Sequence, residues 1–177
     1  VQSYRGEVEQ ADSVLNEAYA LAQQEHGADS VELALTRLAL ARHGGAAGDR
    51  PAEVLAHAIA AGETFASRLG PDHFRVADAL EMRILGLAQL GRSSEAVPHA
   101  DELVARRRSL YGDMSHPHSY ALHVQDSVLR RAGRHLAAIP AFEASLAIHD
   151  ALDGVNALAS QVPLAALALT FEESGHH

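Results

Sequence analysis

The sequence contains no cysteine and no lysine, so that all 14 of its basic residues are arginines. The absence of cysteine excludes disulfide bonds, thiol nucleophiles and cysteine-ligated zinc. The absence of lysine excludes Schiff-base chemistry and the phosphate-binding lysine of a Walker loop. Arginine-only usage also suggests a bacterial genome rich in G and C.

No run of about 18 apolar residues is present, so we expect no membrane partner. The first residues, VQSYRGEVEQ, lack the basic and apolar segments of a signal peptide, which favours a cytoplasmic protein. The absence of an initiator methionine indicates a fragment of a longer protein. The formal net charge of −9 repels polyanions, and we therefore expect no direct nucleic-acid partner.

Glycines recur at a fixed spacing. One series runs 42 residues apart through Gly70, Gly112 and Gly154, and a second, offset by 21 residues, through Gly91, Gly133 and Gly175. Upstream, Gly27 and Gly6 extend the pattern, with a slip of one residue around HGGAAGD at 43–49. Two interleaved series predict two turns in each repeat.

The segments between these glycines have the apolar spacing of helices. VADALEMRILGLAQL and AVPHADELVARRRSL place apolar residues three and four apart and show no strand-like alternation. Asp29, followed three residues later by Glu32, predicts a capping box at the start of the second helix. We predict helices at 7–25, 30–43, 50–67, 73–90, 93–110, 116–132, 136–151 and 159–173.

A pair of antiparallel helices cannot bury its apolar stripe alone, so successive pairs are expected to stack. The expected fold is all-α: an α-solenoid of about eight helices in a single domain over residues 1–177. Its parts are a half-repeat at 1–26, repeats at 27–69, 70–111 and 112–153, and a half-repeat at 154–177.

The segments GRSSEAVPHADEL and GRHLAAIPAFEASLAI resemble the second helix of the tetratricopeptide repeat, and LGPDHF and GDMSHP resemble its inter-repeat linker. The 42-residue spacing is similar to the kinesin light chain type found in bacterial signalling and regulatory proteins. The resemblance implies a right-handed superhelix that binds proteins or peptides on its concave face. Phe74 departs from the pattern, because the linker has proline after its histidine.

No catalytic motif is present: the sequence has no G-x-S-x-G, no glycine-rich phosphate loop and no H-E-x-x-H. We therefore expect no enzyme, no cofactor and no metal site. Among the 12 histidines, His118 and His123 are five residues apart and make a poor helical chelate. His116 could join His118 in adventitious metal binding. His176 and His177 receive no role.

Two further patterns allow more than one interpretation. Glu53 with His57 and Glu95 with His99 are either surface helical pairs or a proton-sensitive patch, in which a carboxylate raises the pKa of histidine. The arginines predict two clusters at opposite edges, either solvated helix ends or carboxylate-binding patches. The clusters comprise Arg68 and Arg106 to Arg108 at one edge, and Arg92, Arg130, Arg131 and Arg134 at the other.

In the family that the sequence resembles, the first helix of each pair lines the groove, which implies 30–43, 73–90, 116–132 and 159–173 here. Aromatic and arginine side chains carry much of the energy of interfaces. The predicted groove residues are Arg83, His118, Tyr120, His123, Asp126 and Arg130.

Three functions remain open: a protein-binding or peptide-binding scaffold, a sensory or regulatory domain that binds a peptide or small molecule for an attached ATPase or transcription regulator, and a histidine-based metal site. The apolar stretch VPLAALALTF near the C-terminus predicts a helix that needs a cover. Further repeats would cover it, or a homodimer through terminal helices.

Overall fold

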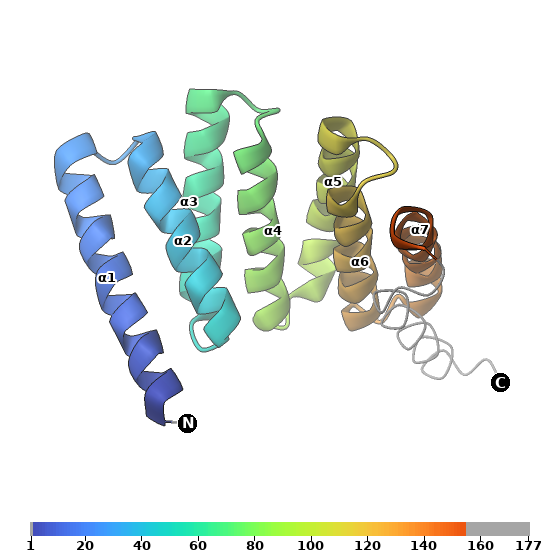
Figure 1. Ribbon diagram of the computed structural model, residues 1–177, viewed down its shortest axis with the longest axis horizontal. Helices are drawn as coiled ribbons and strands as arrows, with labels where there is room; N and C mark the ends of the chain where they lie inside the picture. The colour runs from blue at the N-terminus through green and yellow to red at the C-terminus, as the bar shows by residue number, and fades with distance from the viewer. Residues whose placement is uncertain (1, 155–177) are drawn as a thin grey trace. The chain divides into compact units, whose positions relative to one another are not determined.

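The computed structural model describes residues 2–154, with side chains from residue 10 onward (Figure 1). This part of the chain is helical and contains no strand, which confirms the predicted all-α class. The predicted helix at 159–173 and the self-association ascribed to it lie outside the described residues. The helices are α1 (Gln2–His26), α2 (Val31–Ala47), α3 (Pro51–Leu69), α4 (Phe74–Gln89), α5 (Ser93–Tyr111), α6 (His116–Arg131) and α7 (His135–Asp153).

Helices α3 to α7 begin and end within two residues of their predicted bounds. The other two differ at one end. Helix α1 passes through Gly6, where we predicted a turn, and α2 continues through Gly44 and Gly45 to Ala47. The predicted N-cap is also wrong by one residue, because the Ser30 side chain, and not that of Asp29, accepts the hydrogen bond from the Leu33 amide, at 3.1 Å. Since Leu33 stands three residues after this N-cap, the predicted capping box does not form.

A glycine with positive φ stands after each of the seven helices described, and the spacing between these glycines shows where the repeat slips. It is 21 residues throughout, except for 22 between Gly48 and Gly70. Gly48, at φ 74°, occupies the left-handed conformation that ends α2, and its amide donates to the carbonyl of Gly44 at 2.8 Å. The glycines are Gly27, Gly48, Gly70, Gly91, Gly112, Gly133 and Gly154.

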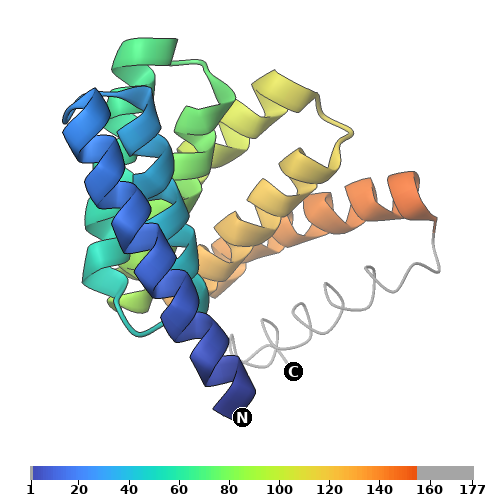
Figure 2. The ribbon, with the colours of Figure 1, turned by 60° about the vertical axis from the view of Figure 1, so that its left-hand side comes forward.

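The chain divides into two compact units, Val1–Leu90 and Gly91–His177. In the N-terminal unit, α2 packs between α1 and α3, and α3 packs on α4 (Figures 1 and 2). Its core is built largely from small residues around Leu38, Phe65 and Met82. Helices α3 and α4 approach so closely that a Cβ at Gly86 would lie 3.0 Å from the backbone nitrogen of Leu55. Small residues therefore set the packing distance in this unit.

In the C-terminal unit, α6 packs on both α5 and α7. Leu103, Leu122, Phe142 and Ile148 are buried there. Figure 2 shows α6 and α7 side by side, so that the end of α7 returns to the level at which α6 begins. This antiparallel return brings together side chains that are far apart in the sequence.

Two buried serines fix the contact between α6 and α7. The Ser119 hydroxyl donates to the Ser145 carbonyl at 3.1 Å, and the Ser145 hydroxyl donates to the Ser119 carbonyl at 3.0 Å. Because both hydroxyls have partners, these polar groups are buried without an unsatisfied donor.

Within the described residues, none of the helices combines the length and the apolar character that crossing a membrane requires.

Candidate binding surface

Helix α6 carries five of the six predicted groove residues, and the structure places two of them inside the C-terminal unit. His118 is 8% exposed, and its Nδ1 lies 2.7 Å from the Asp113 carbonyl oxygen, which can only accept; Nδ1 therefore carries the proton. Asp126 is fully buried and accepts from Arg130 Nε at 3.2 and 3.3 Å. These contacts give His118 and Asp126 a structural role within the unit.

The exposed face of α6 is formed by other residues. Tyr120 is 49% exposed. Arg131 is exposed as well, while His123, Val124 and Ser127 are partly buried. Tyr120 and Arg131 are eleven residues apart, which is about three turns, so both lie on one side of the helix.

This face contains Arg131, which was predicted as part of an arginine cluster but not as a groove residue. Arg130 is rotated by about 80° from Tyr120 on the helix, whereas Arg131 is rotated by about 20°. The difference agrees with their environments, since Arg130 is bound to Asp126 and Arg131 is exposed. The 3.6-residue period of the helix therefore distinguishes Arg131 from Arg130, and it could have been applied to the sequence alone.

Arg83, the sixth predicted residue, lies on α4 in the N-terminal unit and is partly buried. Its Nε is buried and has no hydrogen-bond partner among the described residues. A buried donor without a partner is unfavourable. The groove role of Arg83 stays a prediction.

The predicted arginine clusters are largely engaged in contacts within their own units. Arg68 Nε donates to the Asp29 carbonyl at 3.0 Å. Arg106 Nε donates to Glu102 at 2.8 Å, and Arg108 pairs with Asp113. These contacts support the interpretation of the clusters as solvated helix ends.

The interpretation of the glutamate–histidine pairs as a proton-sensitive patch is wrong at His57. Burial lowers the pKa of the His57 imidazole, the charge of Arg37 lowers it further, and Glu53 opposes both only in part. Glu95 has a different partner from the one expected, because its carboxylate accepts from Arg92 at 2.7 and 2.8 Å. The Arg92 hydrogen bond lowers the pKa of Glu95.

A surface cavity of about 530 Å³ lies along the C-terminal half of α5 and the loop after it. Its charged groups already have partners. Asp101 accepts from Gln125 of α6 at 2.7 Å, and Arg108 pairs with Asp113. The lining residues are Asp101, Val104, Ala105, Arg108, Ser109, Gly112 and Asp113.

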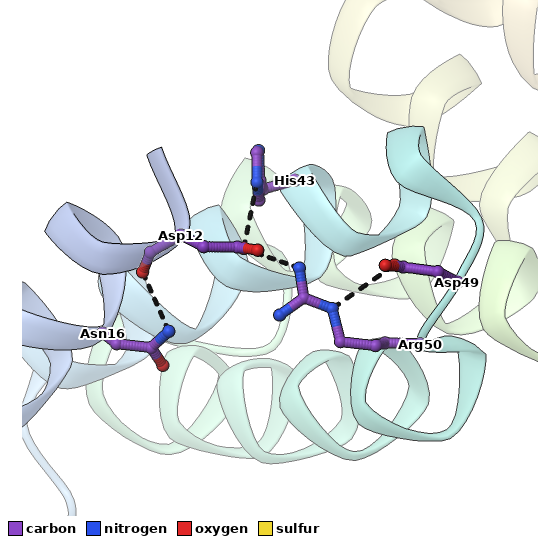
Figure 3. Close-up of polar contacts among 5 residues, drawn as sticks. All are labelled: Asp12, Asn16, His43, Asp49 and Arg50. Atoms are coloured by element: carbon purple, nitrogen blue, oxygen red, sulfur yellow. Dashed lines mark hydrogen bonds and ion pairs between the residues drawn. The ribbon is translucent and has the colours of Figure 1, made fainter. Parts of the chain in front are cut away.

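In the N-terminal unit, a polar cluster joins three helices (Figure 3). Arg50, which precedes α3, donates to Asp12 of α1 at 2.6 Å, and this hydrogen bond lowers the pKa of Asp12. His43 of α2 places Nε2 3.0 Å from the same carboxylate, although its N–H is not aligned for a hydrogen bond. The cluster ties α1 to the start of α3.

No protein-family model and no curated protein sequence matches the chain. Solved structures match its fold over nearly its whole length. BtubC (BKLC) from P. vanneervenii aligns with a TM-score of 0.82 at 18% identity, over 98% of this chain and 69% of that one. The nearly identical TPR-like repeats of a kinesin light chain from Podosopora anserina align with a TM-score of 0.84 at 17% identity, over 98% of this chain and 82% of that one.

These alignments define the class of fold as a helical repeat, which confirms the predicted α-solenoid architecture. More particularly, the fold is of the tetratricopeptide-like kind found in kinesin light chain repeats. At such identities the likeness concerns the fold, and function has to be argued from the surface.

Proposed function

We propose that the chain is a peptide-binding repeat scaffold and that the C-terminal unit binds its partner on the exposed face of α6. The observation that carries this proposal is the position of Tyr120, a large aromatic side chain that is 49% exposed on a packed helix. Aromatic residues with one exposed face are characteristic anchors of binding surfaces. Val124 continues the apolar part of the face by one turn.

The chemistry of the face suggests the kind of peptide. Arg131 supplies a planar cation that pairs well with a carboxylate, about 16 Å along the helix from Tyr120. An extended peptide covers this distance with about five residues. The proposed ligand therefore has an apolar side chain against Tyr120 and Val124, and an Asp, Glu or terminal carboxylate near Arg131.

Binding of a small molecule for an attached effector is supported less well by the geometry. The cavity beside α5 is the natural place for one, but its charged groups, Asp101, Arg108 and Asp113, are already paired. A ligand there would have to replace those contacts. We also favour a protein partner over nucleic acid, because the net charge is −9.

The test is a selection from a random peptide display library on the full chain, followed by affinity measurements with the selected peptide. Tyr120→Ala and Arg131→Ala should each weaken binding by about tenfold or more, as expected for anchor residues.

Matched controls are Tyr111→Ala, which removes another exposed tyrosine, and Arg134→Ala, which removes an exposed arginine beyond the end of α6. Both should bind like the wild type. If the controls weaken binding as much as Tyr120→Ala and Arg131→Ala do, the binding surface lies elsewhere.

A further inference from the structure

Three potential metal ligands converge where α6 begins and α7 ends. They are His116, the first residue of α6, and His149 and Asp153, which lie one turn apart at the end of α7. One donor atom from each lies within 4.8 Å of the other two. The sequence separates His116 from His149 by 33 residues, and the antiparallel return of α7 brings them together.

The Asp153 carboxylate faces both imidazoles. Its Oδ1 lies 3.6 Å from His116 Nε2, and its Oδ2 lies 3.3 Å from His149 Nδ1. In a tetrahedral zinc site with bonds of about 2.0–2.1 Å, neighbouring ligand atoms are about 3.3 Å apart. The two separations, which involve different carboxylate oxygens, are close to this value, and the three donor atoms lie within 4.8 Å of one another, so side-chain rotations would direct all three at one ion.

The position of Asp153 in its helix also favours a cation. A carboxylate at the C-terminus of a helix is repelled by the negative end of the helix dipole, and a bound cation would offset that repulsion. The helical spacing of His149 and Asp153, four residues, places both on one face, which makes them a two-point chelate that His116 completes.

We infer that His116, His149 and Asp153 form a surface site for a divalent transition-metal ion, with zinc as the best-matched probe. Two imidazoles and one carboxylate suit zinc better than calcium or magnesium, which prefer oxygen ligands. Three protein ligands leave a fourth tetrahedral position for water or for a ligand atom from a partner. The ion would fasten the start of α6 to the end of α7.

This site differs from the one that the sequence suggested. From the sequence, His116 was a possible partner of His118 in adventitious metal binding, but His118 is buried and its Nδ1 is bonded to the Asp113 carbonyl. The inference does not rest on peptide binding on α6, because Tyr120, Val124 and Arg131 are not among the three ligands, although His116 lies one turn before Tyr120.

The experiment is calorimetric titration of the full chain with zinc chloride. All proteins compared carry His176→Ala and His177→Ala, so that the terminal histidine pair contributes no binding. The wild-type site should bind one zinc ion per chain. His116→Ala, His149→Ala and Asp153→Asn should each weaken that binding by about tenfold or more, because a three-ligand site loses a bond in every case.

His26→Ala is the matched control. His26 also lies in the last turn of a helix, 3.9 Å from the Glu25 carboxylate, but belongs to no three-ligand cluster among the described residues. It should leave zinc affinity unchanged. Circular dichroism checks that each variant keeps its helix content, and His116 and Asp153 are exposed enough to be replaced without disturbing the core. Absence of zinc binding by the wild type, or unchanged affinity in His116→Ala, would overturn the site.

Discussion

Two helix-interior glycines in the N-terminal unit should respond to alanine in opposite directions. At Gly86 in α4, an added Cβ would lie 3.0, 3.1 and 3.1 Å from the N, Cα and Cβ atoms of Leu55. Two of these are backbone atoms, so relief requires α3 and α4 to move apart. At Gly62 in α3, the nearest atom to an added Cβ is the Ala79 Cβ at 3.4 Å, which is ordinary contact.

The magnitudes follow from two opposing effects. Alanine stabilises a helix interior by about 0.5–1 kcal/mol relative to glycine. Overpacking of a close contact costs about 1–3 kcal/mol. Gly62→Ala should therefore raise the free energy of unfolding by about 0.5–1 kcal/mol, and Gly86→Ala should lower it by about 1–2 kcal/mol.

Urea denaturation and thermal melts followed by circular dichroism would measure both changes. For a chain of this length, each kcal/mol corresponds to about 2–4 °C in Tm. If Gly86→Ala melts at or above the wild-type temperature, the close approach of α3 and α4 does not exist in solution. A Gly62→Ala variant as unstable as Gly86→Ala would likewise refute the distinction between the two sites.

Three further predictions concern hydrogen bonds and protonation. Ser119→Ala and Ser145→Ala should each cost about 0.5–1.5 kcal/mol, because each removes one buried hydrogen bond between α6 and α7, and a double-mutant cycle by urea denaturation should show coupling. Asp12→Asn should lower Tm at neutral pH, because it removes the carboxylate that pairs with Arg50. Arg50 depresses the pKa of Asp12 below 3.8, so the wild type loses this pair only as pH falls through that lowered pKa, and the difference in Tm between wild type and variant should shrink there. In an NMR titration of the folded chain, the His57 imidazole should have its midpoint below 6.5. The unfolded chain then binds a proton at His57 more readily than the folded chain does, so the free energy of unfolding falls as pH drops below 6.5. A midpoint above 6.5 would contradict the burial of this imidazole.

The glycine spacing predicted the helices well, because the described turns share a physical requirement. Each contains a glycine with positive φ, a conformation that other residues adopt at a cost. The same reasoning failed at Gly44 and Gly45, which belong to α2. An added Cβ would lie 3.1 Å from Val54 at Gly44 and 2.7 Å from Leu85 at Gly45. Glycine serves close packing there, and the sequence does not distinguish the two uses.

At the candidate sites, too, some features could be predicted from the sequence and others depended on helix packing. The exposure of Tyr120 and the burial of Asp126 depend on which face of α6 packs on its neighbours, and the helical period alone would have placed Arg131 beside Tyr120. His149 and Asp153 are four residues apart in the sequence, but this pair was not among those predicted. Their approach to His116 depends on how α7 packs against α6, which the sequence pattern did not determine.

The proposal of a peptide-binding scaffold is tested most directly by NMR chemical-shift mapping of the full chain with a peptide selected on it. If the proposal is right, the largest changes fall on the exposed face of α6, at Tyr120, Val124 and Arg131, and they vanish in Tyr120→Ala. Large changes confined to other helices, with α6 unaffected, would contradict it.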